Sequence, residues 1–333
     1  MIANNSNIKT EFSKLIKETV IFLKSENITD PIEILRKLQE VVITGRPLEV
    51  ENVAECIEGE TSYIMIDRNN ILQTGLDEIN NISDEKIRNT LEVQFYNEVA
   101  VDNGGPRKEF FQLILIEIKE KYFDHGLREI LALDYITVGK VFALSILQNG
   151  RIPKFLDAEI LQELVDNLSP SICIANLRTG LDVLGIVEIC RQLPSFIFLF
   201  HHSSVGLTFR KMTTILKPVF TEEGSNRNVF EKATYSAFIR YLREVAGGRR
   251  EPVTLHSVLQ FVTGTEDEPV LGYKLQPCIE FPEAEVTFLP TANTCVNTLK
   301  LSRPNQLTVH LPEDTKLFDL YDYAFSNSYF GLK

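Results

Sequence analysis

The sequence has few cysteines, no long apolar run and a deficit of positive charge. Its 333 residues include 34 Lys and Arg against 46 Asp and Glu, a formal net charge of −12. Because duplex nucleic acids are bound mainly by Lys and Arg that neutralise phosphates, this balance argues against a nucleic-acid partner. Apolar runs such as Phe196–Phe200 are about a quarter of a membrane span, and Met1–Asn7 lacks the basic start and apolar core of a signal peptide. We therefore expect neither a membrane protein nor a secreted one.

The five cysteines are sparse, and no two have the Cys-x-x-Cys spacing typical of zinc sites. An odd number in so long a chain does not suggest a disulfide framework. We therefore expect an intracellular protein of the cytoplasm or the nucleus.

His201 and His202 are adjacent, so their rings point in different directions in a helix or a strand, and no carboxylate or cysteine stands at ligand spacing. The sequence predicts no metal site there.

The first sixty residues are predicted to be helical. Apolar residues recur at intervals of three and four from Ile8 to Leu23, which places them on one helical face. A second helix is predicted to begin at Asp30-Pro31, with Asp30 as its cap and Glu33 completing a capping box, and to end at Gly45. We interpret residues 1–59 as a helical extension that packs on the main domain.

Beyond residue 60 the pattern becomes mixed. Short strands are predicted at 63–66 and 91–95, followed by a break at Asp102–Pro106 and a helix through Phe110 to Ile118. Further helices are expected around 136–148, 155–166, 181–192, 207–217 and 227–245. Gly247 and Gly248 then interrupt the pattern, and we interpret this glycine pair as an interdomain hinge.

A smaller α+β part is predicted after the glycine pair. It contains a short helix at 255–262, strands near 275–281 and 299–301, and a last helix through Leu317 to Ala324.

The sequence has no Gly-x-Ser-x-Gly elbow and no phosphate-binding loop. Val138-Gly139-Lys140-Val141 lacks the hydroxyl that binds magnesium, and we interpret it as a helix surface.

The most informative stretch is Phe288–Leu299, where Cys295 follows a loop with Pro and Thr and precedes an apolar strand. A thiol at such a junction can be accessible while the backbone holds it still. From spacing alone, a buried core cysteine is the favoured reading, because no neighbouring His or Lys would lower the pKa of the thiol.

Four segments, taken together, resemble the catalytic domain of HECT-type ubiquitin ligases over about residues 60–333. The active-cysteine motif is represented by Leu289-Pro290, Asn293-Thr294-Cys295-Val296-Asn297 and Leu299-Lys300-Leu301. The other three segments, in the same order as in the family, are Val101-Asp102-Asn103-Gly104-Gly105-Pro106-Arg107-Lys108-Glu109-Phe110-Phe111, Leu259-Gln260-Phe261-Val262-Thr263-Gly264 with Pro269 and Gly272, and Phe330-Gly331-Leu332.

The resemblance implies an α+β, bilobal fold, with a shortened N-terminal lobe over 60–246 and a C-terminal lobe over 252–333. It implies that Cys295 accepts ubiquitin from a ubiquitin-conjugating enzyme as a thioester and passes it to a lysine of a protein substrate. Thr294 and Asn297 would position the cysteine, and Phe330 would assist the transfer. The lobes of the family move about a short hinge, which we place at Gly247 and Gly248. No metal or organic cofactor is implied, because ATP is consumed upstream by another enzyme.

The chain departs from the family pattern at several positions. Asn293 stands where many members have a His, Val296 replaces an aromatic, Lys108 an Arg and Ser302 a Pro. Only 191 positions separate Gly104 from Cys295, fewer than the family would imply, which suggests an altered docking surface for the conjugating enzyme.

Two other functions stay open. Asn293 and the shortened middle favour an inactive scaffold that binds ubiquitin or a conjugating enzyme. A thiol hydrolase would require a partner histidine, for which His256 and His310 are the candidates near Cys295 in the sequence. In the first motif, the glycine pair Gly104-Gly105 is expected to form a tight turn, and Glu109 is expected to make a buried structural ion pair or hydrogen bond.

Overall fold

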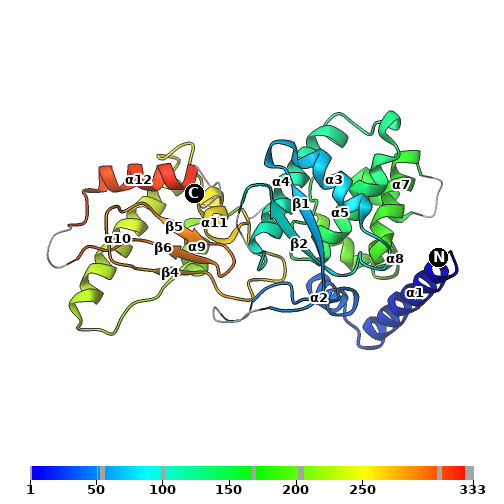
Figure 1. Ribbon diagram of the computed structural model, residues 1–333, viewed down its shortest axis with the longest axis horizontal. Helices are drawn as coiled ribbons and strands as arrows, with labels where there is room; N and C mark the ends of the chain where they lie inside the picture. Colours follow the sequence, from blue (N-terminus) through cyan, green and yellow to red (C-terminus); the bar gives the residue numbers. More distant parts are fainter. Residues whose placement is uncertain are drawn as a thin grey trace. The chain divides into compact units, whose positions relative to one another are not determined.

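A computed structural model describes residues 2–50, 52, 57–98, 102–166, 170–201, 206–305 and 310–326, with the backbone alone for residues 2–9. The chain is a mixture of helices and small sheets, in agreement with the expected α+β class (Figure 1). It divides into two compact units. The first comprises Met1–Leu48, Ile57–Ser203 and Pro269–Leu271, and the second comprises Glu49–Cys56, Ser204–Glu268 and Gly272–Lys333.

The first unit is mainly helical. Its only sheet among the described residues pairs β1 (Thr61–Ile66) with β2 (Thr90–Phe95) in parallel. Its α-helices are α1 (Ile2–Ser25), α2 (Pro31–Val42), α3 (Ile71–Asn81), α4 (Gly105–Tyr122), α5 (Asp134–Leu147), α6 (Ala158–Val165), α7 (Ile172–Leu181) and α8 (Ile186–Gln192). Short 3₁₀ helices are η1 (Arg68–Asn70), η2 (Glu129–Leu131), η3 (Asp182–Leu184) and η4 (Pro194–Phe200).

The two N-terminal helices belong to the core of the first unit. Val20 and Leu23 of α1, with Leu35 and Leu38 of α2, are buried in the same hydrophobic cluster as the strands and α5. The Oδ1 atom of Asp30 caps α2 by accepting from the Ile32 N–H at 2.9 Å, as predicted. Glu33 is expected from the sequence to complete a capping box with Asp30. Its side chain instead forms an ion pair with Arg36, three residues later in the helix.

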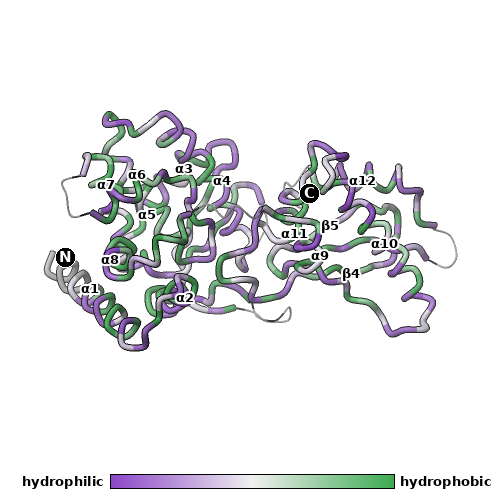
Figure 2. Tube along the Cα trace, turned by 180° about the vertical axis from the view of Figure 1, so that it is seen from behind, coloured by the Kyte–Doolittle hydropathy of each residue, from purple (hydrophilic) through white to green (hydrophobic). Residues whose placement is uncertain are grey.

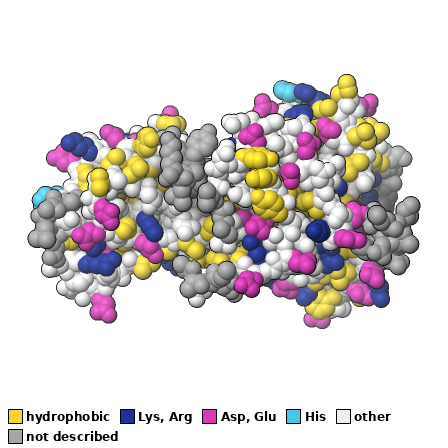
Figure 3. Space-filling model, in the orientation of Figure 1, with side chains coloured by type: hydrophobic (Ala, Val, Ile, Leu, Met, Phe, Trp, Pro, Cys, Tyr) yellow, Lys and Arg dark blue, Asp and Glu magenta, His cyan; other side chains and the backbone are white. Residues whose placement is uncertain are grey.

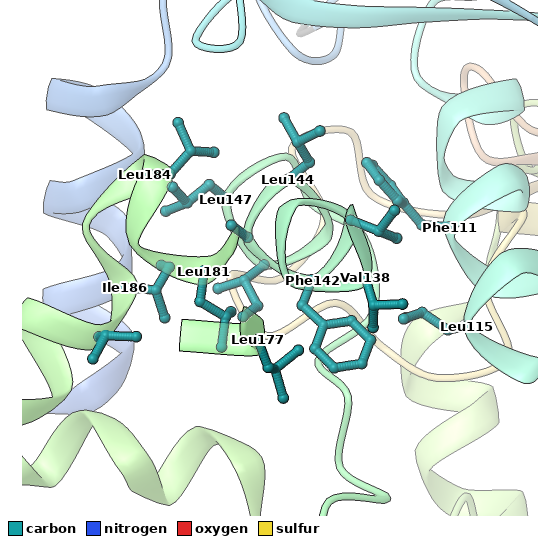
Figure 4. Close-up of a cluster of buried hydrophobic side chains, with 14 of the residues drawn as sticks. Phe111, Leu115, Val138, Phe142, Leu144, Leu147, Leu177, Leu181, Leu184 and Ile186 are labelled. Carbon is teal, nitrogen blue, oxygen red and sulfur yellow. The ribbon is translucent and has the colours of Figure 1, made fainter. Parts of the chain in front are cut away.

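The centre of the first unit is α5, which is buried along most of its length. Figure 2 shows this helix as a hydrophobic segment, and Figure 4 shows its Val138, Phe142 and Leu144 among the side chains of α4 and α7. Gly139 and Gly180 lie at the crossing of α5 and α7, where a Cβ added to Gly180 would lie 2.0 Å from the Ile136 carbonyl oxygen. The interpretation of Val138–Val141 as a helix surface is therefore wrong: the segment is a close helix contact, and α7 was not predicted.

The second unit contains a four-stranded sheet and four helices among its described residues. The strands are β3 (Lys217–Pro218), β4 (Cys278–Glu280), β5 (Thr291–Asn293) and β6 (Thr298–Lys300), in the order β3-β4-β6-β5. β6 pairs in parallel with β4 and antiparallel with β5. The helices are α9 (Phe209–Ile215), α10 (Asn226–Ala246), α11 (Leu255–Thr263) and α12 (Asp314–Ser326).

An aromatic cluster joins three of these helices. Tyr241 of α10 packs edge-on against Tyr321 of α12 with ring centroids 5.2 Å apart, and Phe261 of α11 packs edge-on against Phe325 at 5.1 Å. The Tyr241 hydroxyl donates to Asp322 at 2.8 Å, and Arg250 pairs with the same carboxylate. Edge-to-face rings with a satisfied hydroxyl give these helices a specific arrangement.

Gly247 and Gly248 lie inside the second unit, and the chain passes between the units near residue 203. The Gly247 N–H donates to the Arg243 carbonyl at 3.0 Å, and Gly248 has a φ of 69°. The pair therefore ends α10 as a C-cap, a position for which glycine is equally typical. α10 and α11 contribute to one buried core, and the role of the glycine pair as a hinge stays a prediction.

The helix crossing leads to a stability prediction. Replacing Gly180 by Ala should lower the free energy of unfolding by about 1–3 kcal/mol, because the new methyl group must push the α5 backbone away. Gly206→Ala is the matched control, since nothing lies within 4 Å of its Cβ position. Urea denaturation followed by circular dichroism measures both, and equal stability of the two variants would contradict the close crossing.

Candidate functional site

Cys295 lies in the turn that joins β5 to β6, at the edge of the sheet of the second unit. The two strands form an antiparallel hairpin in which Asn293 stands opposite Thr298. The side chain of Cys295 is half-buried. The interpretation of Cys295 as a core cysteine, which spacing alone favoured, is therefore wrong.

The first half of this turn is held by Asn293. Its side-chain Oδ1 accepts a hydrogen bond from the Cys295 backbone N–H at 3.1 Å. Its backbone carbonyl accepts from the Val296 N–H at 3.3 Å. A short amide side chain that bonds the backbone two residues later mimics a turn, which is the usual reason for Asn in such positions. Asn293 thus makes structural contacts on both sides of the thiol-bearing residue.

The second half is held by Asn297, whose side chain is 2% exposed. Its Nδ2 donates to the Leu275 carbonyl at 2.8 Å, and its own carbonyl accepts from the Cys278 N–H at 3.0 Å. Its φ of 52° lies in the left-handed region, which Asn tolerates better than most residues. These contacts anchor Asn297 itself, and its role in positioning Cys295 stays a prediction.

Thr298 and Cys278 continue the same network. The Thr298 hydroxyl donates to the Val296 carbonyl at 3.2 Å and lies 3.5 Å from the Cys278 Sγ. Thr294 is partly exposed, and its supporting role stays a prediction. Phe330, for which we predicted a role in transfer, lies outside the described residues.

The other described cysteines are less suited to nucleophilic chemistry. Cys173 and Cys190 are buried in the first unit. Burial raises the pKa of the Cys173 thiol and raises that of Cys190 to about 12, because a thiolate is poorly solvated there. Cys278 is half-buried, so it is the natural control for a test of Cys295. Among the described residues, no group of three His, Cys, Asp or Glu side chains could hold a metal ion.

The candidate histidines of a thiol hydrolase have other surroundings. The His256 Nδ1 lies 3.0 Å from the Glu266 carbonyl oxygen and 3.2 Å from the Asp267 Oδ1. These contacts tie the start of α11 to the acidic turn that follows it. His310 is exposed.

The Asp-x-Gly-Gly-Pro motif has a structural role in the first unit. The Asp102 carboxylate accepts from the Val93 N–H at 2.9 Å and from the Gly104 N–H at 2.8 Å. The fully buried Arg107 donates to the Leu91 carbonyl at 3.2 Å. These side chains satisfy backbone groups of β2 that do not pair with β1, so the motif closes an otherwise open strand edge.

The same motif supplies a buried ion pair, as predicted for Glu109. Its Oε1 lies 2.8 Å from Arg68, which also pairs with Glu98 and lies over the Phe95 ring. Burial raises the pKa of Glu109, although Arg68 opposes the shift. Gly104 has a φ of 115° and is the N-cap that precedes α4, which agrees with the expected tight turn.

Comparison with known families identifies one segment of the chain. Residues 221–307 match the model of the HECT-domain (ubiquitin-transferase). This segment contains the whole network around Cys295, and it confirms the resemblance over that part of the chain. No curated protein matches the chain. No described helix is long and apolar enough to cross a membrane.

The Asn297 contacts lead to a second stability prediction. Asn297→Ala should lower the free energy of unfolding by about 2 kcal/mol. The change removes the buried hydrogen bond of the side-chain amide and leaves a residue with a Cβ in the left-handed region. Asn297→Gly should be about 0.5–1 kcal/mol more stable than the Ala variant, since glycine adopts this conformation without steric cost. Lys300→Ala, at an exposed position of β6, is the control. Thermal and urea unfolding measure all three; equal losses in the Ala and Gly variants would exclude the backbone contribution.

Proposed function

We propose that this protein is a HECT-type ubiquitin-protein ligase in which Cys295 carries ubiquitin as a thioester. The observation that supports this proposal best is that a half-buried thiol, in a turn held on both sides, falls within the segment that matches the ubiquitin-transferase family. A transferase nucleophile must be reachable and held in place, and both conditions are met at this turn.

In the first proposed step, the Cys295 thiolate attacks the thioester carbonyl that links ubiquitin to a conjugating enzyme. A new thioester forms on Cys295, and the cysteine thiolate of the conjugating enzyme leaves. Exchange between two thiols of similar pKa is close to isoenergetic, so this step needs alignment of the reacting atoms more than a strong base. The short, tethered turn supplies such alignment.

In the second step, a neutral lysine amine of the protein substrate attacks the Cys295 thioester. An amide bond forms, the thiolate of Cys295 leaves, and the proton of the amine passes to a base. The amide of Asn293 cannot accept this proton near neutral pH. We therefore propose that an acidic side chain orients the amine and receives its proton.

We propose that the two compact units have separate functions. In this proposal the second unit carries the acyl transfer, and the first unit receives the conjugating enzyme. No metal or organic cofactor enters either step. The N-terminal helices share the core of the first unit, so binding experiments should use the full chain rather than a fragment that begins at residue 60.

An inactive scaffold is the second candidate function. It is favoured by Asn293, whose amide oxygen is committed to the Cys295 backbone where many family members have a titratable His. It is also favoured by the short distance of 191 positions between Gly104 and Cys295. Such a protein would bind ubiquitin or a conjugating enzyme without forming a thioester.

The proposal predicts a ubiquitin adduct that depends on Cys295. Incubation of the full chain with activating enzyme, a panel of conjugating enzymes, ATP and ubiquitin should give a band on a non-reducing gel that reductant removes. Cys295→Ala should abolish the band, because no other side chain in the turn is a thiol. Cys295→Ser should give an oxyester that resists reductant, and Cys278→Ala should retain the wild-type adduct.

Three results would contradict the ligase proposal. Binding of a conjugating enzyme without any adduct would favour the scaffold. An adduct that persists in Cys295→Ala would place the nucleophile elsewhere. Release of free ubiquitin from a ubiquitin fusion, lost on His256→Ala, would favour a hydrolase.

A further inference from the structure

We infer that Asn293 is a positioning residue for the transfer reaction, and that it acts by fixing the backbone of Cys295 rather than by moving a proton. This inference rests on the proposed function, because it assigns a role in that reaction. It gives Asn293 a structural role at the position where many members of the family have a histidine.

The first step of the argument is the contact itself. The Asn293 side-chain oxygen lies 3.1 Å from the backbone nitrogen of Cys295 and accepts its N–H. The N–H of Val296, the next residue, donates to the Asn293 carbonyl at 3.3 Å. One residue therefore accepts hydrogen bonds from the thiol-bearing residue and from its successor.

The second step concerns what the rest of the turn already holds. Asn297 is tied to Leu275 and Cys278, so the β6 end of the turn is anchored by buried contacts. On the β5 side, Asn293 accepts two hydrogen bonds across the turn, from the N–H groups of Cys295 and Val296. Loss of its side-chain amide should therefore make the backbone of Cys295 less fixed. The fold of the second unit should stay in place, because Asn293 itself is exposed.

The third step concerns chemistry. The oxygen of an amide accepts a hydrogen bond at every pH from 4 to 10, whereas a histidine at this position would change its charge near neutrality. The turn of this chain is thus held by a group that does not titrate. An aspartate would keep the acceptor but would place a negative charge two residues from Cys295, which disfavours the thiolate.

The test compares Asn293→Ala with Asn293→Asp, with Thr291→Ala on the exposed part of β5 as the control. Three quantities are measured on the full chain: the rate of thioester formation, the hydrogen exchange of the Cys295 amide, and the pH midpoint of Cys295 alkylation by iodoacetamide. The exchange and alkylation measurements do not require any ubiquitin chemistry.

Asn293→Ala should form the thioester about 3–10-fold more slowly, as expected for one lost hydrogen bond, and the Cys295 amide should exchange at least several-fold faster. Its melting temperature should match that of Thr291→Ala. Asn293→Asp should keep the amide protected and should recover the rate at high pH. Its alkylation midpoint should move upward by about 0.5–1 pH unit, because of the added charge.

Wild-type thioester formation by Asn293→Ala would overturn the inference, and so would unchanged exchange of the Cys295 amide in that variant. Failure of Asn293→Asp to exceed the Ala variant at any pH would also overturn it. If the wild-type chain forms no thioester, the ligase proposal and the positioning role in transfer both fail. In that case the exchange and alkylation results show whether Asn293 still fixes the turn, so the two failures are distinguished.

Discussion

The hydrogen bond from the buried Asn297 amide to the Leu275 carbonyl anchors the β6 end of the turn that contains Cys295. It ties the β5–β6 turn to the segment that leads into β4, and the Cys278 N–H reinforces the tie from β4 itself. Because β6 lies between β4 and β5 in the sheet, the turn is held by a neighbouring strand and not only by its own hairpin. A thiol in such a turn can be half exposed while the backbone holds it in place.

The sheet that carries this turn is supported by a helical layer with specific contacts. α11 packs against β5 and β6, and its Phe261 reaches the ring of Phe325 on α12. Arg250 pairs with Asp319 and Asp322 of α12 and lies over the Phe318 ring. These aromatic and charged contacts hold α12 against α11 and against the segment that contains Arg250. Figure 3 shows acidic and basic side chains interspersed over the visible surface.

In the first unit, the Asp-x-Gly-Gly-Pro motif has a structural role. Asp102 and Arg107 satisfy the backbone of β2, and Glu109 forms a buried pair with Arg68. A two-stranded parallel sheet has two open edges, and buried backbone groups without partners cost about 1–3 kcal/mol each. The motif therefore preserves the architecture of the first unit, whereas the chemistry that we propose depends on the turn of the second.

Local patterns in the sequence were sufficient to predict most helices, both strands of the first unit, the cap of α2 and the ion-pair role of Glu109. Each depends on neighbours along the chain or on a charge that must be paired when buried. The helix α7, the burial of Gly139 and the hydrogen bond between Asn293 and Cys295 could not be predicted in this way. Gly247 and Gly248 suit a hinge and a helix cap equally well from sequence, and the hydrogen bond from the Gly247 N–H to the Arg243 carbonyl shows that the pair caps α10. Likewise, the spacing around Cys295 favoured a buried core cysteine. The pairing of β5 with β6 instead places this residue in the turn between the two strands. Spacing constrains local conformation, but exposure depends on which distant segments pack together, and only the tertiary structure decides that.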